Sequence, residues 1–237
     1  MTGSGLAVLR RFAASPGPAA APGSPAPAAA APPAAEAVAG EAAGSAAGGE
    51  RCEMCGEVLD ERHGHLVDTG ERSLVCACRA CFLLFTSDGA AGGRYRAVGD
   101  RYRHDPAAPL SRAAWGELQI PVALAFFFRN SALGRVVASY PSPAGATECD
   151  LDLAAWDALA AGHPLLRAMR PDVEAIIAVR GEQAVEAFLV PIDACYSLAG
   201  RLRLCWRGFD GGAEVRQLLA EFVSDLRQRA SALGPEE

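Results

Sequence analysis

Two short cysteine-rich stretches decide how the first folded part of this chain is built: CEMCG at residues 52–56 and CACRAC at residues 76–81. Each stretch holds two cysteines separated by two residues, the spacing at which a tight turn presents two thiolates to one metal ion. Pairing Cys52 and Cys55 with Cys78 and Cys81 leaves 22 residues between the pairs, close to the spacing of structural zinc sites. The sequence therefore predicts a four-cysteine metal site.

Four cysteine ligands do not by themselves select one metal. Four sulfur ligands suit zinc, a single iron as in rubredoxin, or an iron–sulfur cluster. A rubredoxin carries glycine after its second cysteine pair, where this chain has Phe82. Zinc is the prediction, with iron as the alternative. Cys76 is a fifth thiol that could replace Cys78 as a ligand, serve in metal transfer, or simply be a strand residue.

The residues between the two cysteine pairs predict a hairpin. Short apolar runs at 65–67 and 73–75 flank the turn sequence DTGE, and CFLLF at 81–85 predicts the first turn of a helix. A knuckle, a hairpin and a helix that delivers the last two ligands resemble a treble-clef zinc finger over residues 51–86. His63 and His65 resemble the histidines of HNH-type treble clefs, but the further His or Asn of those nucleases is missing after Cys81 at helix spacing. We expect these two histidines to cap a turn or pack the hairpin.

The first 50 residues predict a disordered arm. From position 13 to 49, 31 of 37 residues are Ala, Pro or Gly, too little large apolar surface to offset the entropy of ordering. The arm begins with a short apolar and basic segment that includes Arg10, Arg11 and Phe12. We predict a docking segment there, with an unstructured terminus as the alternative. Prolines interrupt the apolar run that a twin-arginine export signal needs.

Charge and hydropathy limit the classes of partner. All 22 basic residues are arginines, and against 28 acidic residues they leave a net charge of −6, which argues against non-specific nucleic-acid binding. No run approaches the ~20 apolar residues that cross a bilayer, so we expect no membrane insertion. Clustered cysteines at ligand spacing, without an export signal, predict a reducing, cytoplasmic location.

Residues 51–88 are the predicted finger, and residues 89–110 form a basic, aromatic connector. Arginines that flank tyrosines can bind a partner's acidic surface or stack on a base. The alternative is a strand at 94–98 whose arginines pair with nearby Asp88, Asp100 and Asp105. The candidates for partner contact in this connector are Arg94, Tyr95, Arg96, Arg101 and Tyr102.

Residues 111–237 predict an α+β domain with a mainly antiparallel sheet and a long C-terminal helix. The apolar pattern favours strands at 120–128, 135–140, 173–180, 184–190 and 202–206. It favours helices at 150–161 and 213–230, and one helical turn within 191–198.

This domain shows no phosphate-binding loop, nucleophile elbow or zinc-protease motif. Cys149 and Cys195 are expected to be buried thiols rather than catalytic ones. A second cluster that could contact a partner's carboxylates consists of Arg203, Trp206 and Arg207. We therefore predict a protein without catalytic activity.

Seven stretches together are similar to one known family: RRF at 10–12, CEMCG at 52–56, LVCACRAC at 74–81, GRYRAV at 93–98, YPSPAGATE at 140–148, DVEA at 172–175 and CWRGFDGG at 205–212. The chain resembles an uncharacterised actinobacterial family of unknown function whose members are encoded beside uptake nickel–iron hydrogenase genes. The resemblance implies an accessory role in hydrogenase assembly or operation, with a hydrogenase subunit or maturation factor as protein partner. The leading hypothesis is a zinc-binding adaptor; the alternatives are an iron–thiolate electron carrier and a zinc-finger nucleic-acid-binding regulator.

Overall fold

A computed structural model of the chain describes residues 49–87, 89–120, 122–143, 145–208 and 211–234. The predicted docking segment with Arg10, Arg11 and Phe12 lies outside the described residues. Two sheets, one of three strands and one of seven, together with helices, confirm the predicted α+β class. None of the helices in the described ranges combines the length and the apolar character needed to cross a membrane.

The smaller sheet, which we call the finger sheet, has the order β2-β1-β3. Strands β1 (Gly64–Asp68) and β2 (Ser73–Ala77) form the predicted antiparallel hairpin, and β3 (Tyr95–Ala97) pairs with the other edge of β1. At the turn, the Asp68 carboxylate accepts hydrogen bonds from the backbone N–H groups of Gly70 and Glu71. Helix α1 (Arg79–Leu84) follows β2, and the short 3-10 helix η2 (Ala90–Gly93) precedes β3.

Alternation along the finger strands gives the finger a small core of its own. Leu66, Val75 and Ala77 are buried together with Cys52 and Cys78. The opposite face of β1 presents Val67, which packs in a separate cluster with residues of the larger domain. Both faces of the central finger strand are therefore covered.

The larger sheet has the order β10-β4-β9-β8-β5-β6-β7, and only its β10–β4 pair is parallel. The predicted hairpins at 120–140 and 173–190 are present as β5–β6 and β8–β9. The strands are β4 (Arg103–His104), β5 (Leu124–Asn130), β6 (Arg135–Ser142), β7 (Gly145–Cys149), β8 (Glu174–Arg180), β9 (Val185–Pro191) and β10 (Ser231–Ala232).

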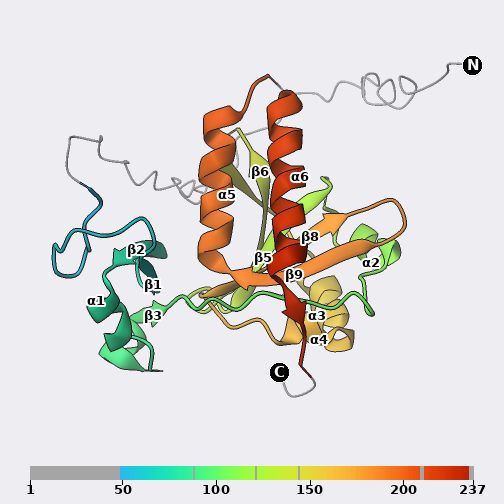
Figure 1. Ribbon diagram of the computed structural model, residues 1–237. Coiled ribbons are helices and arrows are strands. Elements are labelled where there is room, and N and C mark those ends of the chain that lie inside the picture. Colours follow the sequence, from blue (N-terminus) through green and yellow to red (C-terminus); the bar gives the residue numbers. More distant parts are fainter. Residues whose placement is uncertain (1–48, 88, 121, 144, 209–210, 235–237) are drawn as a thin grey trace, which may run out of the picture. The chain divides into compact units, whose positions relative to one another are not determined.

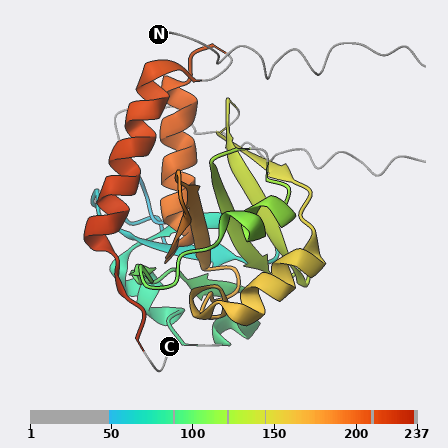
Figure 2. The ribbon, with the colours of Figure 1, turned by 90° about the vertical axis from the view of Figure 1, so that its right-hand side faces the viewer.

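Helices cover both faces of this sheet (Figures 1 and 2). On β5, Ala125 and Phe127 point to one side and Leu124 and Phe126 to the other, as the period of two in a strand requires. The first side packs against α2 (Arg112–Glu117), α3 (Leu153–Gly162) and α4 (Pro164–Arg167). The second side packs against α5 (Ile192–Cys205) and α6 (Gly212–Arg229), which lie side by side.

Helix α5 corrects the sequence prediction for residues 191–206. We expected one helical turn and then a strand at 202–206, but the chain forms a single helix of 14 residues. Cys195, Leu198 and Leu202 follow helical spacing and are buried against the sheet. The helix also contains Gly200, but a glycine inside a helix costs only about 1 kcal/mol relative to alanine, and this burial outweighs it.

Residues 89–110 contribute one strand to each sheet, β3 to the finger sheet and β4 to the larger one. The predicted local pairing is wrong for Arg94 and Arg96, the two arginines of the predicted strand at 94–98, and Arg101 also pairs with a distant carboxylate. The partners come from distant segments, since strand pairing brings those carboxylates closer than the sequence neighbours. The pairs are Arg94 with Asp68 at 2.8 Å, Arg96 with Asp172 at 3.0 Å and Arg101 with Glu174 at 2.7 Å.

Candidate metal centre

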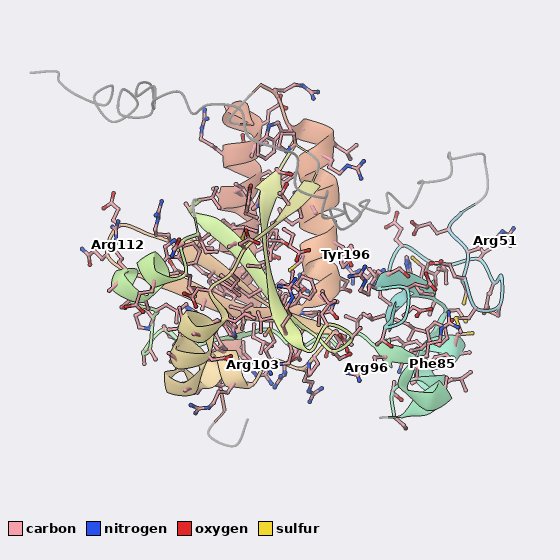
Figure 3. All side chains as sticks on the ribbon, turned by 180° about the vertical axis from the view of Figure 1, so that it is seen from behind. Arg51, Phe85, Arg96, Arg103, Arg112 and Tyr196 are labelled. Carbon is pink, nitrogen blue, oxygen red and sulfur yellow. The ribbon has the colours of Figure 1, made fainter. Side chains whose placement is uncertain are left out.

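The four cysteines of the predicted site converge. The Sγ atoms all lie within 4.8 Å of one another in the set Cys52, Cys55, Cys78 and Cys81. The Cys55 and Cys78 sulfur atoms are 3.8 Å apart, too far for a disulfide and equal to the edge of a tetrahedron with metal–sulfur bonds of about 2.3 Å. All four are free cysteines. The donor set therefore fits one tetrahedral, thiolate-bound metal ion, and Figure 3 shows sulfur atoms gathered between the labelled Arg51 and Phe85.

Backbone hydrogen bonds shape the first cysteine pair. Gly56 has a φ of +79°, a conformation that glycine adopts without strain, and its N–H donates to the carbonyl of Cys52 at 2.7 Å. The N–H of Cys52 donates in turn to the carbonyl of Glu57 at 2.7 Å. The turn is thus closed on both sides, which holds Cys52 and Cys55 on one side of the loop.

The second pair is positioned by the start of α1. Cys78 is the residue before the helix, and its carbonyl accepts from the N–H of Phe82 at 2.8 Å. Cys81 lies in the first turn of the helix, so the two thiols flank the helix N-terminus. The two thiols of this pair therefore lie beside those of the first pair.

The thiols influence one another strongly. Burial raises the pKa of Cys52, but backbone N–H groups, that of Cys78 first among them, donate to its sulfur and lower the pKa to about 6. The pKa of Cys81 is raised to about 12, first by its hydrogen bond with the Cys55 thiol and then by burial. Sulfurs this close cannot all carry negative charge unaided, whereas a divalent cation among them favours the thiolate form.

Cys76 belongs to a different group. It lies opposite His65 in the β1–β2 ladder, and its sulfur and one ring nitrogen each of His63 and His65 lie within 4.8 Å of one another. The sequence prediction considered Cys76 as an alternative ligand of the four-cysteine site and the histidines as packing residues. Two histidines two residues apart at the start of one strand, with the cysteine at the matching register of the next strand, are the signal that could have revealed this group.

Gly64, which separates the two histidines, contacts α1. A Cβ atom at this position would lie 2.5 Å from the ring of Phe82, the residue after Cys81. The absence of a side chain therefore allows the helix that carries Cys81 to pack directly on the strand that carries the histidines.

The predicted partner contacts are distributed over separate elements. Tyr95 packs edge to face against Phe85 at 5.3 Å between ring centroids, and the Arg229 guanidinium lies 4.0 Å from the Tyr102 ring centroid. In the second cluster, Trp206 donates its indole N–H to the carbonyl of Gly208. Arg207 donates to the carbonyl of Trp206, and the Arg203 side chain lies against Gly145. These residues thus contact their own chain, as Arg94, Arg96 and Arg101 do.

An exposed apolar surface was missed by the sequence analysis. Helix α1 buries none of its residues, and Leu83 and Leu84 are 49% and 69% exposed. Val58, 57% exposed, and Leu83 line an open cleft of about 1050 Å³ that also contains His63 and His65. The spacing of CFLLF predicted a helix, but which side of it would be covered depends on contacts far along the chain.

Comparison with known proteins identifies the family. No curated protein and no solved structure matches this chain. A family of unknown function, DUF5947, matches residues 51–230, a range that includes the finger and nearly all of the larger domain. The chain therefore belongs to the DUF5947 family.

Proposed function

We propose that this protein is a non-enzymatic adaptor whose finger is held together by one zinc ion. The observation that carries this proposal is the convergence of four free thiols on one point, two from a closed turn and two from a helix start. Structural zinc sites have four protein ligands, whereas catalytic ones keep a position open. Cys52, Cys55, Cys78 and Cys81 would hold the ion and fix the turn against α1.

Two observations support a protein as the partner. Exposed leucines on a helix without buried residues form an apolar surface, which is typical of contact sites. The arginines that could have contacted phosphates, Arg94, Arg96 and Arg101, pair instead with carboxylates of the same chain. An apolar protein surface therefore fits the finger better than nucleic acid does.

The identity of the partner in this proposal comes from the sequence resemblance, which implies a nickel–iron hydrogenase subunit or maturation factor. Affinity purification of the full chain from its native host should enrich such a protein. Leu83→Ser/Leu84→Ser should abolish the enrichment, because it removes the apolar surface of α1. Leu204→Ser is the matched control, since Leu204 is 81% exposed on α5. Failure to enrich any hydrogenase or maturation protein contradicts this part of the proposal.

The metal is tested separately. Elemental analysis of the purified protein should find zinc bound to the four cysteines and a colourless solution. Iron with visible absorbance would contradict zinc and favour the electron-carrier alternative, because iron–thiolate centres absorb visible light and zinc–thiolate centres do not. Cys55→Ser/Cys81→Ser should remove this ion, and Cys149→Ser/Cys205→Ser, which changes two thiols outside the site, should retain it.

A further inference from the structure

We propose that His63, His65 and Cys76 form a second metal site, distinct from the four-cysteine centre, that binds a divalent transition-metal ion of the zinc class. The three ligand atoms lie within 4.8 Å of one another, close enough to share one ion. The site adds a second metal-binding function to the finger and does not depend on the partner proposed above.

Strand geometry places the three side chains on one face. His63 precedes β1 directly and His65 is its second residue, so the period of two brings both side chains to the same side. Cys76 is the direct cross-strand neighbour of His65 in the antiparallel pair. The group is therefore set by the register of the β1–β2 hairpin and does not depend on a flexible loop.

Hydrogen bonds fix the proton on the same nitrogen of both histidines. The Nδ1 atom of His63 lies 2.9 Å from the carbonyl oxygen of Asp60, and a carbonyl can only accept, so this Nδ1 carries the proton. The Nδ1 atom of His65 lies 2.9 Å from a carboxylate oxygen of Asp193 and donates to it in the same way. In each neutral ring, Nε2 then carries the free lone pair that a metal ion needs.

Asp193 acts as an orienting residue of this site. A histidine that binds metal characteristically donates its other ring N–H to a carboxylate or a backbone carbonyl, and this pair of partners is present here. Asp193 belongs to the first turn of α5, so its carboxylate reaches His65 from the larger domain. The ligand in the finger is therefore oriented by a residue 128 positions further along the chain.

Among the residues that the structure describes, the Nε2 atom of His63 has no hydrogen-bond partner. This atom is fully buried, and the whole His63 side chain is only 9% exposed. A buried nitrogen lone pair without a donor is destabilising, and a metal ion at this point would satisfy it. The two imidazole rings are 4.9 Å apart between centroids in an edge arrangement, which keeps both beside the Cys76 thiol.

The donor set selects the kind of ion. Two imidazoles and one thiolate suit zinc, cobalt, nickel or copper and do not suit magnesium or calcium, which prefer oxygen ligands. Three protein ligands leave one position of a tetrahedron for water or another small ligand. His63, His65 and Asp193 all line the open cleft of about 1050 Å³, which provides the path by which an ion could enter.

The number of ions per chain tests this proposal. The full-length protein is saturated with Zn²⁺, freed of unbound ions by gel filtration, and its zinc content per chain is measured. We expect two ions in the unchanged protein and one in His63→Gln/His65→Gln, because the four-cysteine centre retains its own ion. His104→Gln should retain two, since His104 stacks on Phe188 in the larger domain, away from the three ligands.

The thiol ligand has a separate readout. Co²⁺ added to protein whose four-cysteine centre is already filled with Zn²⁺ should produce a cobalt–thiolate absorbance from Cys76. This absorbance should disappear in Cys76→Ser and persist in Cys205→Ser. Asp193→Asn should weaken Co²⁺ binding by about 10- to 100-fold, the usual loss when an orienting partner of a histidine ligand is removed.

One ion that is present in the unchanged protein and kept in the double histidine variant would overturn the proposal, and so would two ions in that variant. Co²⁺ binding that is unaffected by Cys76→Ser would exclude this thiol as a ligand. Since these measurements use the filled four-cysteine centre as an internal reference, failure of the second site is distinguishable from failure of the first.

Discussion

The finger and the larger domain differ in how much apolar core each one has. The larger domain buries large apolar side chains on both faces of a seven-stranded sheet, among them Phe127, Ile177, Phe188 and Trp156. The core of the finger is a handful of side chains, two of them cysteines of the candidate metal centre. A core this small supplies little folding free energy, and natural domains of this kind depend on metals or disulfides. We therefore expect the larger domain to depend on apolar burial and the finger to depend on a bound metal ion.

The largest expected effect comes from removing a metal ligand. Cys52→Ser or Cys81→Ser should unfold the finger and leave the larger domain folded, because a structural zinc ion contributes about 10–16 kcal/mol in isolated finger peptides. Backbone NMR would show loss of the β1–β2 signals while β5 and β8 signals persist. Cys149→Ala is the control, since Cys149 packs at the edge of the larger core and should cause little change. A folded, metal-free finger would contradict the comparison.

A substitution in the core of the larger domain should destabilise that domain and leave the finger folded. Phe127 is 1% exposed and stacks on Trp156 at 4.8 Å between ring centroids. Phe127→Ala should lower the free energy of unfolding of the larger domain by about 3–5 kcal/mol, because it leaves a cavity. Denaturant unfolding of the protein measures this change. Leu204→Ala, on the exposed surface of α5, should stay within about 0.5 kcal/mol of the unchanged protein.

The buried carboxylate at the finger turn should give an intermediate, pH-dependent effect. The pKa of Asp68 is lowered, first by its hydrogen bond with Arg94 and against the effect of burial, and backbone N–H groups of the turn lower it further. Since this pKa is below its value in the unfolded chain, the stabilisation is fully present above about pH 4 and is lost as the pH falls through the folded value. Asp68→Asn should cost about 1–3 kcal/mol at pH 7 and flatten the acid dependence.

Unfolding of the finger followed between pH 7 and pH 3 in both proteins provides the measurement for Asp68. An unchanged acid profile in Asp68→Asn would show that other groups control the acid stability of the finger.

The smallest effect is expected from a partly exposed ion pair of the larger domain. Arg227 of α6 pairs with Glu186 of β9 at 2.7 Å, and both side chains reach solvent. Arg227→Ala should change the free energy of unfolding by at most about 1 kcal/mol, because exposed ion pairs gain little over hydration. A loss of several kcal/mol on thermal unfolding would show that the larger domain also relies on charged contacts.

The sequence predicted the features that depend only on the spacing of nearby residues. The grouping of Cys52, Cys55, Cys78 and Cys81 follows from two turns of fixed geometry, and the long helix α6 follows from its apolar stripe. The partners of Arg96 and Arg101 could not be predicted this way, since Asp172 and Glu174 approach them only after both sheets have formed. The full length of helix α5 was missed because its apolar side chains are explained only by burial against a sheet formed by distant segments.

The second metal site was only partly readable from the sequence. His63 and His65 were visible as a pair, and Cys76 was visible as an extra thiol, but their association requires the register of the hairpin. The carboxylate of Asp193 could not have been foreseen, because it is delivered by a helix of the other domain.

Gly64 lies where the elements of the two candidate metal sites pack against each other. Because Gly64 has no side chain, the ring of Phe82, the residue after Cys81, can pack against the chain between His63 and His65. A methyl group at this position would displace the helix of one site from the strand of the other without changing any ligand. Such a shift would change the distances among the ligands of both groups, so a substitution at position 64 should weaken metal binding at both.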